Sequence, residues 1–292
     1  MQKKLFFFLL SLLLAFGLKV QAQYEFFQEK TNFVFFAGTV KSEQTDQLGH
    51  YYGLYADYLA YKSNDHRFSV GPYAVISRSD SRYQEANGLN RNLEYGGGLS
   101  FGYYEPDFSF RYQSFLGFSF GITKGVEKQE LQMREGLFEA WQDDLFFSGS
   151  LNFNLLKAFG TRPNLFPRSQ IQLRYKTPIS SDKVAYWEGR GIETYVWDKT
   201  YLEVLAKQSI YKDLLTWRSN IYYSPKLVFS YNYSKGDKRD FYGLGLEISL
   251  AREYRDDFLS LGVLYKVSEI TDNYFIVSLN FNLSSFLSSS NK

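Results

Sequence analysis

Residues Tyr274–Leu283, which read YFIVSLNFNL, decide the fold class of this chain. Alternate positions are large and apolar, and the positions between them become polar along the segment, with Ser278, Asn280 and Asn282. Successive side chains of a β-strand point to opposite faces of a sheet. The segment therefore predicts a strand with one apolar face and one face made largely of small polar side chains.

The same alternation recurs along the chain and is clear over residues 108–120, 145–155, 241–250 and 259–267. One face is large and apolar, and the other carries Ser, Asn, Gly and isolated charges. A soluble sandwich would bury the aromatic face as its core. A transmembrane barrel would turn that face to lipid and line its interior with the polar face. Alternation alone does not choose between the two.

Strand length and composition favour the barrel. The alternating stretches run for roughly 10–14 residues, whereas strands of soluble sheets average about 5–6 residues and a tilted membrane strand needs about 9–11. Aromatic residues make up 20% of the chain, yet the mean hydropathy is −0.33. This combination does not suit a helical membrane protein, but it suits strands that alternate lipid-facing and interior residues.

We predict twelve strands in an antiparallel, up-and-down transmembrane β-barrel, and ten or fourteen strands stay open as alternatives because Lys157–Pro167 is long for a turn. The predicted strands cover residues 31–40, 50–62, 66–78, 91–104, 107–122, 144–156, 168–177, 194–207, 217–234, 240–251, 257–268 and 273–284.

The connections predict the orientation of the barrel. The odd-numbered connections include the long polar segments Lys124–Asp144 and Pro178–Glu193, whereas most even-numbered ones are short, as at Glu105–Pro106. Outer-membrane barrels have short periplasmic turns and longer extracellular loops. We therefore expect both termini in the periplasm.

The N-terminus predicts export. Lys3 and Lys4 precede the apolar segment Leu5–Leu18, and Val20 and Ala22 supply small residues before a cleavage point. This is the pattern of a secretory signal peptide over residues 1–22, and the apolar segment is too short for a spanning helix. Residues 23–292 then form a single barrel domain surrounded by outer-membrane lipid.

Composition also excludes several functions. The formal net charge of +2 gives no sign of a nucleic-acid partner. The absence of Cys excludes disulfides, thiol catalysis, thiolate metal sites and a lipoprotein anchor. We expect no metal or other cofactor.

In this pattern the chain resembles Gram-negative outer-membrane β-barrels in general. The Ala22–Gln23 junction and the Tyr- and Asn-rich strands are similar to those of Bacteroidota. Such barrels usually end on an aromatic residue, a position that Phe281 or Phe286 could fill here, although six or more residues follow. The resemblance covers the mature chain, implies a bacterial outer-membrane location and assigns no functional residue.

The chain contains two histidines, His50 and His66. Enzymes among outer-membrane barrels commonly pair a His with a Ser or an Asp. His50 is expected at the extracellular end of a strand, where an Asp from a neighbouring loop (Asp46, Asp80, Asp143 or Asp144) could make it a general base. The plainer interpretation, which we prefer, is a surface His at a strand end. Asp143 and Asp144 are expected at a solvated loop end, pointing to opposite faces.

The interior charges are the better candidate site. Alternation directs ten charged side chains inward, six basic and four acidic: Asp57, Glu94, Arg111, Arg174, Lys176, Glu203, Lys207, Lys226, Glu247 and Lys266. This mixture argues against strong charge selection. The charges either pair across the bore and fill it, or flank a narrow wet channel. Eight-stranded barrels are filled and sixteen-stranded barrels hold a channel, so twelve strands do not decide.

These observations favour a narrow channel for small polar solutes, including saccharides. Two alternatives remain. One is a non-conducting barrel that acts as a scaffold or accessory subunit for proteins of an envelope or secretion system, in contact through its long loops. The other is a surface lipid hydrolase that uses His50.

Overall fold

The computed structural model describes residues 31–43, 47–62, 68–83, 87–103, 116–154, 170–210, 215–218, 221–236, 239–252, 257–268 and 273–287. Residues 1–22, which we predict to be a signal peptide, lie outside this part, as do His66, Arg111 and the segment Lys157–Pro167. No helix among the described residues is long and apolar enough to cross a membrane.

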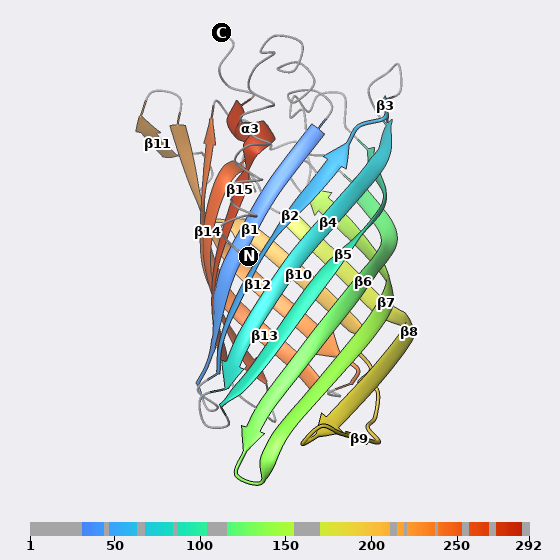
Figure 1. The fold of residues 1–292 in the computed structure, drawn as a ribbon. Coiled ribbons are helices and arrows are strands. Elements are labelled where there is room, and N and C mark those ends of the chain that lie inside the picture. Colours follow the sequence, from blue (N-terminus) through green and yellow to red (C-terminus); the bar gives the residue numbers. More distant parts are fainter. Residues whose placement is uncertain are drawn as a thin grey trace, which may run out of the picture.

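Twelve long strands form a closed antiparallel barrel, as predicted (Figure 1). The ring closes where β15 pairs with β1 and where β8 pairs with β10. The twelve are β1 (Thr31–Ser42), β2 (Gln47–Tyr58), β4 (Phe68–Tyr83), β5 (Gly88–Tyr103), β6 (Leu116–Met133), β7 (Gly136–Asn154), β8 (Gln170–Trp187), β10 (Tyr201–Ser209), β12 (Ile221–Ser234), β13 (Arg239–Arg252), β14 (Asp257–Ser268) and β15 (Tyr274–Asn282). Four short elements are added: β3 (Tyr61–Lys62), β9 (Arg190–Ile192), β11 (Leu215–Arg218) and α3 (Leu283–Leu287).

The apolar face of each strand points outward. On β13, the outward Leu244 and Leu246 are 58% and 55% exposed, whereas Glu247 and Ser249, at the alternate positions of the strand, are 5% and 0% exposed. A soluble barrel would show the opposite pattern, because a continuous apolar band on its surface would be left in water. The aromatic face is therefore the lipid-facing band of a membrane barrel, which excludes the sandwich alternative.

The band has a clear limit on β6 and β7, at the end of the barrel opposite α3. Outward side chains are apolar up to Ile122 and Leu145, and the next outward pair, Lys124 and Asp143, forms a 3.4 Å ion pair. On β7 the band runs from Leu145 to Phe153, about 26 Å along the strand at about 3.3 Å per residue. At a tilt of about 40° this is a height of about 20 Å, within the band of about 25 Å seen in such barrels. Exposed tyrosines mark this rim, as in an aromatic girdle: Tyr52, Tyr95, Tyr175 and Tyr242.

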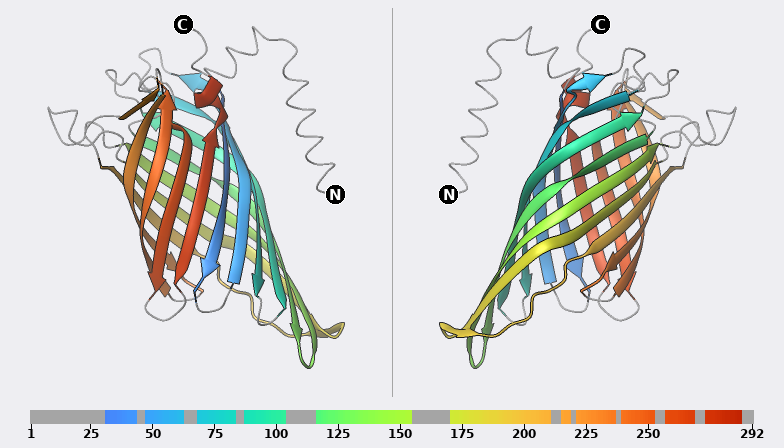
Figure 2. Two further views of the ribbon diagram at one scale, coloured as in Figure 1. Left: turned by 90° about the vertical axis from the view of Figure 1, so that its left-hand side faces the viewer. Right: turned by 90° about the vertical axis from the view of Figure 1, so that its right-hand side faces the viewer.

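Strands β5 to β8 continue beyond this rim as a slanted projection, at the end opposite α3 (Figure 2). We call it the tongue and define it as residues 88–94, 123–144 and 177–192. Strands β6 and β7 pair as far as Met133 and Gly136, so the hairpin between them turns only at residues 134–135. By contrast, β12 and β13 pair only as far as Ser234 and Arg239, near the rim.

The tongue corrects the prediction that Lys124–Asp144 and Pro178–Glu193 are loops. Both are mostly strand, in β6, β7, β8 and β9. The error has a physical cause: water reaches both faces of the tongue, so both faces are polar and the apolar alternation that signals a strand fades. On β6 the inward Glu127 and Gln129 alternate with the outward Lys128 and Glu130.

At the other end of the barrel, the predicted short turn Glu105–Pro106 lies outside the described residues, as does the longer segment Lys157–Pro167. The two ends of the barrel domain meet on this side, where the Phe33 backbone N–H donates a 3.2 Å hydrogen bond to the Ser284 hydroxyl of α3.

The outward face gives a direct test of the membrane band. Leu246→Arg should destabilise the barrel by about 2–4 kcal/mol, because a guanidinium near the middle of the bilayer has no water. Val184→Arg, an outward position on the tongue, should have little effect. Denaturant unfolding in lipid vesicles measures both, and equal losses would contradict the assigned band.

Candidate functional site

The barrel interior has two unlike walls. On β1, β2 and β4 to β6, aromatic rings lie over glycines: a Cβ at Gly38 would collide with the Tyr51 ring, and one at Gly53 with the Phe36 ring. The opposite wall, on β8, β10 and β12 to β14, carries most of the interior charges. Nine of the ten charges predicted to point inward lie on described strands; the tenth, Arg111, lies outside them. That these nine line a conducting path stays a prediction.

The most buried charges form a cluster on β10 and β12 to β14. Lys226 and Glu247 face each other on β12 and β13, with Nζ 3.6 Å from Oε1, and their side chains are 5% and 6% exposed. Glu247 also contacts Lys207 at 2.5 Å, and Lys226 contacts Asp257 at 2.5 Å. Each charge therefore has at least one close partner of opposite sign, as buried charges require.

A second cluster lies nearer the rim, around Glu203 of β10. Arg174 on β8 is its cross-strand neighbour, with Nη1 3.3 Å from Oε2. Lys266 approaches Glu203 to 3.9 Å and donates a 2.6 Å hydrogen bond to the Asn232 side-chain oxygen. The side chain of Arg174 is 54% exposed, so this guanidinium is open to water inside the barrel.

The third pair joins Lys176 of β8 to Glu94 of β5 at 2.5 Å, with the Lys176 ammonium 3.9 Å from the centre of the Phe146 ring. Asn92 donates a further 3.0 Å hydrogen bond to Glu94. Asp57, on β2 and away from these pairs, accepts a 3.4 Å hydrogen bond from Asn32.

Most of the pairs run along the charged wall, whereas Lys176–Glu94 joins that wall to β5 of the aromatic wall. The widest of those described, Lys176–Glu94 and Lys266–Glu203, each span three strand-to-strand steps of a twelve-strand ring. A diametric pair would span six. The charges therefore hold neighbouring strands together and leave their field directed from one side of the lumen.

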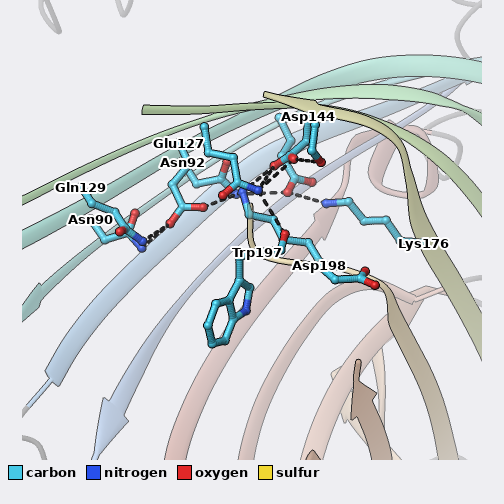
Figure 3. Close-up of polar contacts among 12 residues, drawn as sticks. Asn90, Asn92, Glu127, Gln129, Asp144, Lys176, Trp197 and Asp198 are labelled. Atoms are coloured by element: carbon cyan, nitrogen blue, oxygen red, sulfur yellow. Dashed lines mark hydrogen bonds and ion pairs between the residues drawn. The ribbon is translucent and has the colours of Figure 1, made fainter. Parts of the chain in front are cut away.

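A non-strand segment, residues 193–200, crosses the interior face of the tongue between β9 and β10; we call it the strap. Lys199 places its Nζ 2.6 Å from Glu127 Oε2 and 2.6 Å from Asp144 Oδ2. Gln142 donates hydrogen bonds to Asp144, at 3.0 Å, and to the Trp197 carbonyl oxygen, at 3.2 Å. Figure 3 shows Glu127 and Asp144 around this contact, with the Trp197 indole pointing away from it. Burial disfavours the Lys199 ammonium, but the two carboxylates outweigh burial and raise its pKa.

The other side of the strap is held by Asp198. Its carboxylate lies 2.8 Å from the Lys235 ammonium, beyond the end of β12, and accepts hydrogen bonds from the Thr200 hydroxyl and backbone N–H. These donors, Lys235 first, lower the pKa of Asp198 to about 2. Gly236 permits the approach, because a Cβ there would collide with the Asp198 carbonyl oxygen.

The strap corrects two expectations. Residues 194–207 were expected to form one strand, but β10 begins at Tyr201. Asp144 was expected at a solvated loop end, yet its side chain is 0% exposed, while that of its neighbour Asp143 is 52% exposed on the other face. The position of Asp144 could have been read from the sequence, because it shares the inward parity of Ser148 and Ser150. The contact between Asp144 and Lys199 could not have been read from the sequence.

His50 lies at the rim, as expected, and its side chain is exposed. Its ring Nδ1 lies 3.1 Å from the Thr39 hydroxyl. Asp80 is its cross-strand neighbour on β4, but that carboxylate is bound by Arg78 at 3.2 Å. Among the described residues, no group of three or more His, Cys, Asp or Glu could hold a metal ion.

No family model and no curated protein matches the chain. Solved structures do: the β domain of the Bordetella autotransporter BrkA has a TM-score of 0.52 at 11% identity and covers 87% of this chain and 99% of its own. The translocator domain of NalP from Neisseria meningitidis scores 0.48 at 10% identity, covering 86% and 88% of the two chains. A monoaromatic hydrocarbon channel, CymD, scores 0.43 at 8% identity, with 91% of both covered. At these identities the BrkA likeness shows the fold alone: this chain folds as an outer-membrane β-barrel.

The buried cluster predicts a stability difference. Glu247→Gln leaves Lys207 without its carboxylate and Lys226 with only Asp257, and should cost about 3–5 kcal/mol, as expected for breaking a buried pair. The exposed pair gives the control: Asp143→Asn should cost less than about 1 kcal/mol. Denaturant unfolding measures the loss of stability in both variants. Equal losses would mean that Glu247 is well hydrated.

Proposed function

We propose that the protein is an outer-membrane barrel of a Gram-negative bacterium that passes small polar solutes through a narrow lumen. The observation that carries this proposal is the arrangement of the interior charges. Most of them pair along one wall, the widest pairs described span three of the twelve strand-to-strand steps, and Arg174 remains 54% exposed inside the barrel. A lumen filled by charge pairs would bury such a group and would join strands six steps apart.

The size of the ring is compatible with a lumen. Twelve strands about 4.8 Å apart, tilted by about 40°, enclose a backbone ring about 24 Å across. Inward side chains take up much of this width and leave a passage that suits small solutes better than polymers of any bulk.

The mouth at the tongue end favours uncharged solutes. A cavity of about 190 Å³ lies there against β1, β2, β4 and β15, on the side away from the charged wall. The inward side chains that line it are uncharged, and most are hydroxyls and aromatic rings: Val40, Ser42, Gln47, Tyr51, Ser79, Ser81 and Tyr274. His50 and Asp80 complete the lining from the outward face, and the Asp80 carboxylate is paired with Arg78. Hydroxyls, an amide and aromatic faces are the groups that hold a polyhydroxylated solute, which supports a saccharide as the transported class.

A second candidate function is a scaffold for an envelope or secretion assembly. The observation that favours it is the tongue, which projects beyond the lipid band and leaves apolar side chains in water. Val184 and Ile192 are 49% and 42% exposed there, and Tyr195 of the adjoining strap is 93% exposed. Exposed apolar groups outside a membrane commonly mark a surface for a partner protein.

Conductance distinguishes the two candidates. Purified protein in planar bilayers should conduct, and Arg174→Gln should raise cation over anion permeability by roughly a factor of four, because a unit charge at about 10 Å in water is worth about 0.4 kcal/mol, with opposite sign for the cation and the anion. Lys124→Gln, outside the barrel, should leave selectivity unchanged. Folded wild-type protein that never conducts would rule out the channel and leave the scaffold.

The orientation is tested by labelling, which the absence of native Cys makes simple. With the termini in the periplasm, Arg134→Cys at the tip of the tongue should react with a membrane-impermeant maleimide in intact cells. Tyr61→Cys, at the opposite end, should react only after the outer membrane is permeabilised. The reverse pattern would invert the proposed topology.

A further inference from the structure

The strap is anchored to β8 at both ends with matched lengths. Tyr201 faces Lys176 at one end, and Ile192 faces Ala185 at the other. Eight residues of β8, 177–184, therefore lie opposite the eight residues of the strap. In the described pairings β8 bonds to β7 along this stretch, but its other edge has no strand partner.

An unpaired strand edge of this length is unusual, because its backbone groups invite another strand. The strap itself has a sequence that could fill it. Residues 194–197 are Thr, Tyr, Val and Trp, all residue types enriched in strands. The last strap residue, Thr200, already lies at this edge, with its hydroxyl 3.1 Å from the Thr177 hydroxyl. The preceding part of the strap is instead held on the tongue by Lys199 on Glu127 and Asp144, and by the bond from Gln142 to the Trp197 carbonyl.

Two features of β8 explain why the edge does not capture the strap outright. Pro178 has no N–H to donate to a ladder. The register against β7 also shifts at Leu145/Phe146, where Ile179 is the extra residue on β8, and such a bulge disrupts pairing locally. The backbone pairing available along 177–184 is thus weakened near its β10 end, where it competes with the side-chain contacts of the strap.

We propose that the strap is a gate at the mouth of the barrel, with two positions. In the first, seen here, Lys199 latches it across the interior face of the tongue. In the second, it lies along the free edge of β8 and joins β9 to β10 as one strand, which clears the mouth. The matched lengths let the strap change position while both flanking strands keep their register. As a gate for solutes, this inference rests on the proposed channel function.

The latch has the properties of a switch. Lys199 is shared by two carboxylates, of which Asp144 is fully buried beneath the strap, and Asp198 holds the far side through the exposed Lys235. Removing one ammonium would release both carboxylates at once. The strap ends on β9 and β10 would remain paired, so release moves only residues 193–200.

Disulfide trapping tests the second position without reference to transport. Ser180 and Trp197 would face each other if the register at the two anchors continued, and both side chains are exposed. The Ser180→Cys/Trp197→Cys protein should oxidise slowly with the latch intact and at least tenfold faster once Lys199→Met is added. Lys199→Arg, which keeps the charge, should stay slow.

Tyr186→Cys/Gly191→Cys, an observed cross-strand pair, controls for oxidation in the folded barrel. Heat-dependent migration on SDS gels confirms that each variant is folded. If the control pair oxidises while the Ser180→Cys/Trp197→Cys pair never does, with or without Lys199→Met, the second position does not exist and the proposal is wrong. If Lys199→Met fails to fold, the Ser180→Cys/Trp197→Cys protein with native Lys199 still tests whether the second position exists.

Single-channel recording then tests whether the movement gates. The oxidised Ser180→Cys/Trp197→Cys protein should stay in its higher-conductance state until a reductant is added, whereas wild type should fluctuate. Trapping without any change in conductance would overturn the gate but leave the channel. A wild-type barrel that never conducts would overturn the channel, while the oxidation rates would still report whether the strap moves.

Discussion

The structure depends on one constraint: inside the bilayer no backbone N–H or C=O can be left without a partner. Through most of the lipid-facing band the described strand edges are therefore paired, and the ring closes through the short seam between β8 and β10, which covers Gln170–Lys176 on β8. Beyond the rim at the tongue end the constraint disappears, because water satisfies exposed backbone groups. Both unusual features of this barrel lie there: the tongue and the free edge of β8 from which the strap departs.

The interior follows from the same constraint applied to side chains. Lys226 and Glu247 can be almost fully buried because each is paired on a neighbouring strand. On the other wall, Gly38 and Gly53 make space for Tyr51 and Phe36, so bulk is supplied by rings lying against the backbone. The result is a lumen with charge on one side and aromatic and hydroxyl groups on the other. A solute passing along it would meet opposite-sign pairs and neutral hydrogen-bonding groups, which together give little reason to select strongly by charge.

The sequence predicts the part of the fold that the membrane dictates. The outward set on β13, with Leu244 and Leu246, and the inward set with Glu247 could be assigned because lipid and lumen demand opposite residue types. The strands of the tongue could not be assigned, because water on both sides of β6 and β7 removes the contrast between apolar and polar faces. The ion pairs were equally out of reach: Lys176 meets Glu94 from three strands away, and such a contact depends on tilt and stagger, which no single strand encodes. The predicted orientation of the termini rests on loop lengths, and it stays a prediction.

The strap is where local sequence and tertiary structure disagree. Residues 194–200 belong to a predicted strand, 194–207, and their flanks β9 and β10 are strand, yet residues 193–200 are not. In a consistent fold each local preference agrees with the whole, and disagreements concentrate at functional sites. Here the preference is overridden by one lysine held by two carboxylates and one amide bound to a carbonyl, while the strand edge that would satisfy it stays vacant alongside. A segment that has strand propensity, a vacant edge of matching length and a small set of contacts holding it elsewhere has what a two-position element requires.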